Sequence, residues 1–242
     1  MPPRRTRPTL PVVVSVGGSV LLTGERDREY LSRLAELVRR VGAERPLVVT
    51  VGGGRTAREY IRIGRELGLT EIELDEIGID VTRLNARLLA ALVGPPAPAA
   101  PPTTVAAAVH EVNQASPIVM GGTEPGHTTD GVAALVAARL RAERLVNATN
   151  VAGLYDRDPR AGPGARRIAH ASWTEFSTIV DASVRGGAGE NFLFDRLGAQ
   201  TLARADIPLA IVDGRDIANL EAAIRGSRFE GSWVGGAPPG TR

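Results

Sequence analysis

Short apolar runs alternate with longer amphipathic segments from residue 11 to residue 225. The short runs are rich in Val, Ile and Leu and predict strands at residues 11–16, 46–51, 117–120, 144–148 and 207–212. Apolar residues at helical spacing predict helices at residues 27–41, 55–67, 79–93, 104–114, 129–143, 172–181, 193–205 and 216–225. Alternating strands and helices favour an α/β fold, with a mostly parallel sheet covered on both faces.

Three of the predicted strands end in glycine, at residues 17–18, 52–54 and 121–122. Glycine lets backbone N–H groups approach an anion closely. In a parallel sheet, sites lie at the carboxyl ends of the strands, and all three glycine turns fall there. Three such turns indicate a site that holds several phosphates, and therefore phosphoryl-transfer chemistry.

Composition argues against a nucleic-acid-binding protein and against a membrane protein. Aromatic residues make up 4% of the 242 residues, the net charge is +2, and aromatic and basic residues are not interleaved, which argues against nucleic-acid binding. No apolar run is long enough to span a bilayer, and the basic residues 1–10 lack the apolar stretch of a signal peptide. We expect a disordered N-terminus at residues 1–10, a single domain at 11–242, no membrane partner and a cytoplasmic location.

All 29 basic residues are arginines, because the chain contains no lysine. Phosphate charge must therefore be met by arginine, backbone N–H groups, helix N-termini or a metal ion. There is no cysteine, and the three histidines are widely separated. We assign no protein side chain as a direct metal ligand. P-loop, protein-kinase, dinucleotide-binding and GxSxG motifs are all absent.

Polar residues beside the glycine turns are candidates for the site. Arg55 and Arg58 follow the second turn on one helix face, as an anion cradle or as solvent-facing arginines. Asp75 reads either as a helix cap or as an acceptor for ribose hydroxyls. Asp130 begins a helix, where it complements the helix dipole or organises a metal ion or arginine at the transferred phosphoryl group. His127 reads as an exposed loop residue rather than a general base.

A second group of polar residues follows the predicted strand at 144–148. Thr149, Asn150, Tyr155 and Asp158 lie within ten residues and suit an adenine nucleotide, with Tyr155 against the base or ribose. Asp158-Pro159 is by itself only a turn signal.

Taken together, five stretches resemble the amino-acid kinase superfamily, and most closely its archaeal-type uridylate (UMP) kinases. They are VVVSVGGSVL (12–21), LVVTVGGGRTAREYI (47–61), LDEIGIDVTRLNARLL (74–89), PIVMGGTEPGHTTDGVAALVA (117–137) and ATNVAGLYDRDP (148–159). The resemblance implies a three-layer α/β/α sandwich with an eight-stranded, mostly parallel sheet. It also implies an acceptor-binding half at residues 11–143, an ATP-binding half at 144–235, and a hexamer built from dimers.

Residue by residue, the resemblance implies ATP and UMP as substrates, with Mg²⁺. The UMP contacts would be Gly53, Asp75, Thr123, Glu124, Pro125, Gly126, His127, Thr128 and Thr129. The ATP contacts would be Gly18, Ser19, Gly54, Arg58, Thr149, Asn150, Tyr155 and Asp158. We expect Asp130, Arg58 and Gly18 to carry catalysis, Asp130 by holding the charges around the transferred group in register.

The chain departs from the family pattern at three places. Ala152 stands where relatives usually have an aspartate, and Ser15 stands near the position of a lysine found in many relatives. The glycine-rich loop at 186–189 leads into GENFLFD instead of small residues, although Asp195 keeps its place.

Two alternatives to UMP phosphorylation remain open. The same fold can phosphorylate another small phosphate or phosphonate, such as isopentenyl phosphate, but the region of Arg55, Arg58 and Tyr60 suits such acceptors less well. The second alternative is a non-catalytic relative that binds nucleotide or stores an oxyanion. Ala152 and the absence of lysine support this alternative.

Overall fold

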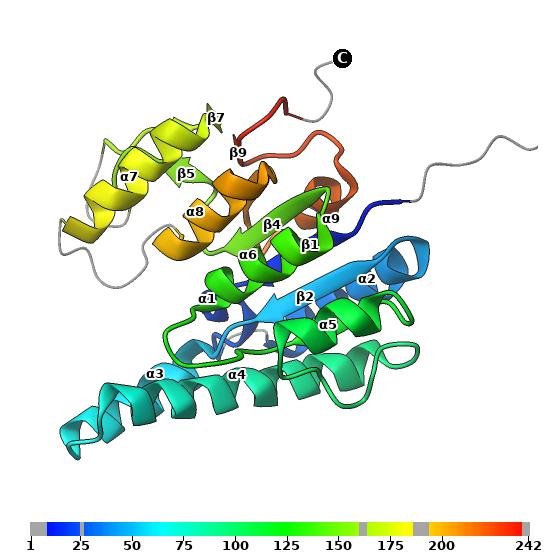
Figure 1. The fold of residues 1–242 in the computed structure, drawn as a ribbon, viewed down its shortest axis with the longest axis vertical. Helices are drawn as coiled ribbons and strands as arrows, with labels where there is room; N and C mark the ends of the chain where they lie inside the picture. Colours follow the sequence, from blue (N-terminus) through cyan, green and yellow to red (C-terminus); the bar gives the residue numbers. More distant parts are fainter. Residues whose placement is uncertain (1–8, 25–26, 160–163, 186–193, 239–242) are drawn as a thin grey trace, which may run out of the picture.

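The computed structural model describes residues 9–24, 27–159, 164–185 and 194–238 (Figure 1). Of the N-terminal segment predicted to be disordered, only Thr9 and Leu10 are described, and both are exposed. The glycine-rich loop at 186–189 lies outside the described residues.

A central sheet with strand order β3-β2-β1-β4-β8-β9-β7 runs through these residues. Its pairs are parallel except β8 with β9, which is antiparallel. The strands, in chain order, are β1 (Val12–Val16), β2 (Leu47–Val51), β3 (Ile118–Met120), β4 (Arg144–Thr149), β7 (His170–Ala171), β8 (Leu209–Asp213) and β9 (Ser232–Val234). The described part of the sheet thus has seven strands, where the family resemblance implies eight.

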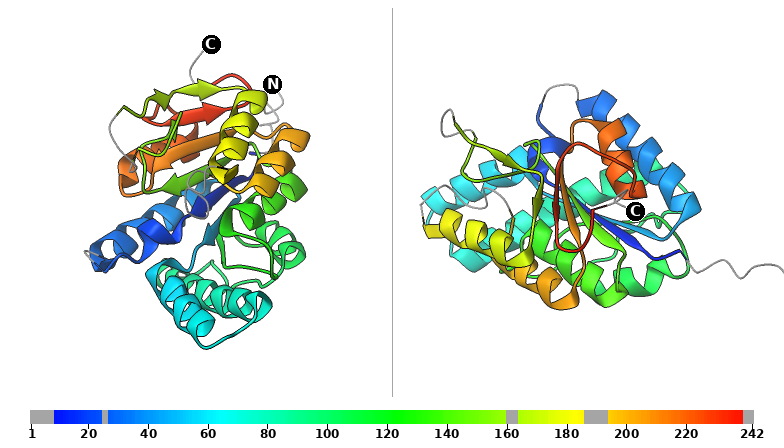
Figure 2. Two further views of the ribbon diagram at one scale, coloured as in Figure 1. Left: turned by 90° about the vertical axis from the view of Figure 1, so that its left-hand side faces the viewer. Right: turned by 90° about the horizontal axis from the view of Figure 1, so that it is seen from above.

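Helices cover both faces of the sheet, as Figure 2 shows. They are α1 (Gly18–Leu21), α2 (Asp27–Glu44), α3 (Gly54–Glu66), α4 (Glu71–Val93), α5 (Val105–Val112), α6 (Thr129–Leu140), α7 (Trp173–Arg185), α8 (Arg196–Ala205) and α9 (Ile217–Arg225). The predicted α/β class with a mostly parallel sheet is confirmed.

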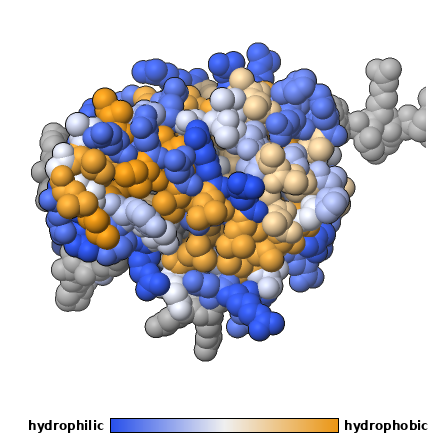
Figure 3. Space-filling model, turned by 90° about the horizontal axis from the view of Figure 1, so that it is seen from below, coloured by the Kyte–Doolittle hydropathy of each residue, from blue (hydrophilic) through white to orange (hydrophobic). Residues whose placement is uncertain are grey.

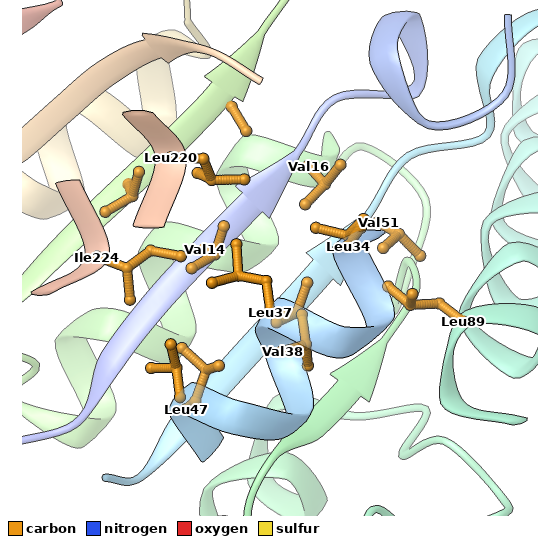
Figure 4. Close-up of a cluster of buried hydrophobic side chains, with 14 of the residues drawn as sticks. Val14, Val16, Leu34, Leu37, Val38, Leu47, Val51, Leu89, Leu220 and Ile224 are labelled. Carbon is orange, nitrogen blue, oxygen red and sulfur yellow. The ribbon is translucent and has the colours of Figure 1, made fainter. Parts of the chain in front are cut away.

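The core forms two clusters, one on each face, because successive strand residues point to opposite sides. Val14 and Val16 of β1 pack against α2 and α9, and Figure 4 shows Leu34, Leu37, Leu220 and Ile224 converging on them. Val13, one residue away, belongs to the cluster beneath α5, α6, α7 and α8. Two fully covered faces explain why the strands read as continuous apolar runs.

Several elements differ from the prediction. Helix α4 begins at Glu71 rather than residue 79, with a capping box in which Thr70 and Glu73 satisfy each other's backbone N–H groups. A short antiparallel pair that was not predicted follows β4: β5 (Leu154–Tyr155) pairs with β6 (Arg167–Ile168). Helix α1 and strands β7 and β9 were not predicted.

Candidate active site

The first two glycine turns are in direct backbone contact. A Cβ atom built on Gly18 would lie 2.1 Å from the backbone nitrogen of Gly54, and one built on Gly52 would lie 2.5 Å from that of Gly18. Gly54 itself has a φ of +65°, a conformation that side chains disfavour. We call this contact of Gly18 with Gly54 the glycine junction. No other residue type fits there without moving the backbone.

Backbone donors remain free at the glycine junction. The N–H groups of Gly18, Ser19, Gly53 and Gly54 donate to no acceptor among the described residues. Arg58, in the second turn of α3, is exposed, and its side chain likewise has no hydrogen bond or ion pair with a described residue. Free amides with a nearby guanidinium are the donor set that binds phosphate.

Arg55 is oriented away from this donor set. Its guanidinium lies beside Gly24, about 3.1 Å from where a Cβ atom would stand, and its charge helps lower the pKa of Asp27. Burial opposes that shift, and hydrogen bonds from Thr23 and Gly24 assist it. The two arginines of the sequence-predicted anion cradle therefore lie in different surroundings: Arg55 lies near the carboxylate of Asp27, whereas the Arg58 side chain has no hydrogen bond or ion pair within the described part of the chain.

The third glycine turn is fixed by α4. Thr82 Oγ1 accepts a 2.6 Å hydrogen bond from the N–H of Gly122. The guanidinium of Arg83 donates to the carbonyl oxygens of Gly122 (3.2 Å) and Thr123 (2.9 Å). Asp75 Oδ2 accepts a 2.8 Å bond from the N–H of Gly126. Because α4 begins at Glu71, the reading of Asp75 as a helix cap is wrong, and its carboxylate lies against the loop at 123–129.

Two polar side-chain atoms in that loop have no hydrogen-bond partner among the described residues. Thr123 Oγ1 and His127 Nδ1 are both buried, and Glu124 Oε1 lies 3.3 Å from His127 Nδ1. Glu124, Pro125 and Gly126 are exposed. Buried polar atoms are nearly always satisfied, so these two are suited to a ligand's donors and acceptors.

Asp130 lies in a polar network between the sheet and α6. Ser15 Oγ donates a 2.6 Å hydrogen bond to Asp130 Oδ1, and Asn147 also hydrogen-bonds to this carboxylate. Burial raises the pKa of Asp130 to about 6; the nearby charge of Asp195 adds to the rise, while the two hydrogen bonds oppose it. A carboxylate with a perturbed pKa beside a glycine-lined edge is a common mark of an active site.

Asp195 and Thr128 complete this network. Thr128 caps the N-terminus of α6 by accepting from the N–H of Gly131, and its hydroxyl donates 2.9 Å to Asp195 Oδ2. Asp195 in turn caps α8. The caps of two helices are thereby joined beside Asp130.

A buried polar row crosses the sheet at this edge and was missed in the sequence. Thr50, Ser15 and Asn147 lie side by side on β2, β1 and β4, at most 2% exposed. They lie on the face of the sheet that α6 covers, because Val13, two residues before Ser15, belongs to that cluster. The signal that could have identified this row is the single polar residue near the end of each apolar strand.

Four of the residues predicted to bind ATP, Thr149, Asn150, Tyr155 and Asp158, lie at the end of β4 or after it, and β4 is the neighbour of β1. The N–H of Gly17 donates to the carbonyl of Ala148 (2.9 Å), so the first glycine turn adjoins Thr149. Tyr155 lies on β5 and is half-buried, as is Asp158, whereas Ala152 is exposed. The four predicted ATP residues from Thr149 to Asp158 thus lie on the β4 side of the glycine junction, and Asp75 lies with the 123–129 loop beside α4. The other four, Gly18, Ser19, Gly54 and Arg58, lie at the junction or on α3.

A model of the Amino acid kinase family matches residues 11–213. The chain belongs to this family. It is 42% identical to a uridylate kinase of Methanothrix thermoacetophila over 216 residues, which are 89% of this chain and 96% of that protein. It is 41% identical to a uridylate kinase of Thermoplasma acidophilum, over 92% of this chain and 96% of the relative.

Solved structures agree with this family fold. The crystal structure of a uridylate kinase from Archaeoglobus fulgidus superposes with a TM-score of 0.82 at 38% identity, covering 92% of this chain and 99% of that one. A UMP kinase from Bacillus anthracis, at 17% identity and a TM-score of 0.73, supports the fold alone. No helix of this amino acid kinase in its described parts is long and apolar enough to cross a membrane. The described residues also contain no cluster of three His, Asp or Glu side chains that could hold a metal ion.

Proposed function

We propose that this chain is a UMP kinase that transfers the γ-phosphoryl group of ATP to UMP. The observation that carries the proposal is the glycine junction: two glycine turns with free backbone N–H groups touch, with one set of candidate nucleotide contacts on each side. Family membership and the uridylate kinase relatives support the same activity.

The reaction needs positioning rather than a general base. An oxygen of the UMP phosphate forms a bond to the γ-phosphorus of ATP while the bond from that phosphorus to the bridging oxygen breaks, giving UDP and ADP. The attacking oxygen is already an anion, so no proton has to be removed. Such transfers are accelerated by in-line placement and by neutralising charge on the moving group.

The two sides of the glycine junction divide the binding work. On the acceptor side, within residues 11–143, Gly53, Asp75 and the loop from Thr123 to Thr129 would hold UMP. On the other side, within residues 144–235, Thr149, Asn150, Tyr155 and Asp158 would hold ATP. Gly18, Ser19, Gly54 and Arg58 would contact the phosphates of ATP between them, with free amides and one unpaired guanidinium.

Asp130 would organise the charges around the transferred group. Asp130 is on α6, and its carboxylate lies close to the glycine turns. Carboxylate oxygens are ligands that Mg²⁺ prefers. Magnesium, when bound with ATP, supplies positive charge that offsets the phosphates.

One assay tests which small molecule accepts the phosphoryl group. Purified protein with Mg-ATP is offered UMP, CMP, dUMP and isopentenyl phosphate, and ADP formation is followed by a coupled assay. We expect UMP to give the highest kcat/KM. Preference for isopentenyl phosphate would change the acceptor but keep the kinase. Nucleotide binding without turnover of any acceptor would indicate a non-catalytic relative.

We also propose that the chain forms a homodimer through what we call the α3–α4 surface. Among the described residues, most of the exposed large hydrophobic side chains gather there, and Figure 3 views this apolar face from below. The α3–α4 surface consists of Tyr60, Ile63, Leu67, Leu69, Ile72, Leu84, Leu88 and Leu92. Patches of this kind usually mark protein interfaces.

A second copy fits the α3–α4 surface because α4 is charge-asymmetric along its length. Its first half carries Glu71, Glu73, Asp75, Glu76 and Asp80, and its second half carries Arg83 and Arg87. Two such helices pairing antiparallel would place acidic halves against basic halves, as a two-fold axis requires. Dimers of this type would be the unit of the expected hexamer.

Light scattering after size exclusion tests this assembly. Leu88→Glu combined with Leu84→Glu should reduce the oligomer by separating the paired α4 helices, because the new charges would be desolvated in the interface. Glu36→Gln, on exposed α2, serves as a control that should keep the wild-type mass. A double variant with the wild-type mass would place the interface elsewhere.

A further inference from the structure

The turn between β8 and α9 lies against the start of the segment from Thr149 to Asp158, which is predicted to bind ATP. We call residues 149–158 the ATP segment. Asp213, the last residue of β8, is the register partner of Thr149 at the end of β4. The N–H of Gly214 donates a 2.8 Å hydrogen bond to the carbonyl of Thr149. A Cβ atom on Gly214 would lie 2.9 Å from that of Ala148, so the turn and the end of β4 approach at backbone distance.

Arg215 bridges this turn and the ATP segment. Its Nε and Nη2 donate to the two carboxylate oxygens of Asp213 at 2.8 and 2.6 Å, a bidentate pair. The same Nη2 lies 3.3 Å from the carbonyl oxygen of Asn150. The backbone N–H of Arg215 also donates to Asp213 (3.0 Å). The guanidinium is therefore held in one orientation although the Arg215 side chain is 60% exposed.

Arg215 keeps the partly buried carboxylate of Asp213 in its ionised form. Burial by itself would raise the pKa of Asp213, but the hydrogen bonds and charge of Arg215 outweigh it and hold the pKa below its usual value. Near Asp213, the Tyr30 hydroxyl of α2 is buried without a hydrogen-bond partner among the described residues. Burial, together with the charge of Asp213, raises the pKa of that hydroxyl.

We propose that Arg215 is a positioning residue for ATP. The proposal rests on the function proposed above. Arg215 makes a bidentate pair with Asp213 and contacts the carbonyl oxygen of Asn150. These contacts hold the start of the ATP segment against the β8–α9 turn. Arg215 does not reach the acceptor side, where α4 holds the loop at 123–129. Removing Arg215 should therefore weaken ATP binding and leave UMP binding unchanged.

Calorimetry with a non-hydrolysable ATP analogue plus Mg²⁺, and separately with UMP, tests this. Losing a charge-assisted hydrogen bond that orders the site should raise the Kd of Arg215→Ala for the analogue about tenfold, with the Kd for UMP within twofold of wild type. Arg215→Lys should be intermediate, because an ammonium keeps the charge but not the fork. Arg228→Ala is the charge-matched control, since Arg228 is exposed and its side chain has no hydrogen bond or ion pair with a described residue.

Asp213→Asn provides a second variant in case Arg215→Ala is poorly folded. It keeps the arginine but removes the charged partner of its fork, and it should also weaken the ATP analogue selectively. An unchanged affinity for the analogue in Arg215→Ala, or an equal loss for UMP, would overturn the proposal. If wild type binds both nucleotides without turnover, the proposed function fails, yet the selective effect of Arg215 would still be measurable.

Discussion

On the acceptor side of the glycine junction, one continuous helix fixes the candidate site; on the ATP side, separate short elements do. Helix α4 contributes Asp75, Thr82 and Arg83 to three successive contacts with the loop around Gly122 and Gly126. The ATP segment is held by the Arg215 fork and by the two-residue strands β5 and β6. Anchoring on a long helix favours a preformed acceptor site, whereas the geometry of the ATP side depends on contacts among several separate elements.

The glycine junction belongs to both sides, and breaking it should have the largest effect. Gly18→Ala would place Cβ 2.1 Å from the nitrogen of Gly54, so the backbone must move. We expect the free energy of unfolding to fall by more than about 3 kcal/mol and turnover to be lost. Denaturant titration and the coupled assay measure the two effects.

Gly78→Ala is the matched control for that substitution. A Cβ atom there would meet Ile61 Cδ1 at 3.4 Å, an ordinary contact, in the interior of α4. Alanine favours helix over glycine, so stability should rise by up to about 1 kcal/mol. If both alanine variants behaved alike, the close approach of the two glycine turns would have no energetic importance.

Asp130 tests whether the two sides act together. Asp130→Asn keeps the shape of the side chain and removes its charge, so we expect kcat to fall at least about a hundredfold. Affinities for UMP and ATP, measured separately by calorimetry, should change much less. Circular dichroism should show an intact fold. Near-normal turnover would remove Asp130 from the catalytic group.

The same carboxylate makes stability depend on pH. Folding raises the pKa of Asp130 from 3.8 to about 6, so the folded protein favours its protonated form. The stabilisation from this group is present below about pH 4 and is lost as the pH rises through 6. At pH 7.5 the ionised group costs up to about 3 kcal/mol.

A melting-temperature comparison between pH 4.5 and 7.5 checks this sign. Asp130→Asn should gain stability relative to wild type as the pH rises, by several degrees at pH 7.5. Taking the difference between the two proteins cancels other titrating groups. A difference that stayed constant with pH would mean that Asp130 is not strained by burial.

The sequence predicted what depends on local pattern. Strands β1, β2 and β4, and the glycine turns that follow β1 and β2, could be predicted from β-branched apolar runs, because both faces of these strands are covered. Strands of two or three residues, such as β7 and β9, have no such pattern and exist through pairing with distant segments. The first turns of α4 were missed because Ile72 is exposed there, although Thr70 and Glu73 spell a capping box.

The candidate site divides in the same way. Asp130 stood out as a helix-initiating acid, but its partner Ser15 lies 115 residues away and was noted only as a departure from the family pattern. Asp75 and Gly126, 51 residues apart, meet only in the fold. Arg215 had no motif to mark it, since its significance comes from the approach of β8 to β4.

Substituting Asp75 is the most direct way to weaken the acceptor side alone, and we expect it to have the smallest effect of these variants. Asp75→Ala removes the acceptor for the N–H of Gly126 and a carboxylate placed for ribose hydroxyls. We expect the Kd for UMP to rise about tenfold, equivalent to one charged hydrogen bond, with the Kd for ATP unchanged. Asp75→Asn should lose less, because the amide oxygen still accepts. Glu76→Ala, exposed on the same turn of α4, is the control. Unchanged UMP affinity in Asp75→Ala would exclude Asp75 from the acceptor site, and a selective loss would show that the acceptor side can be weakened without disturbing the ATP side.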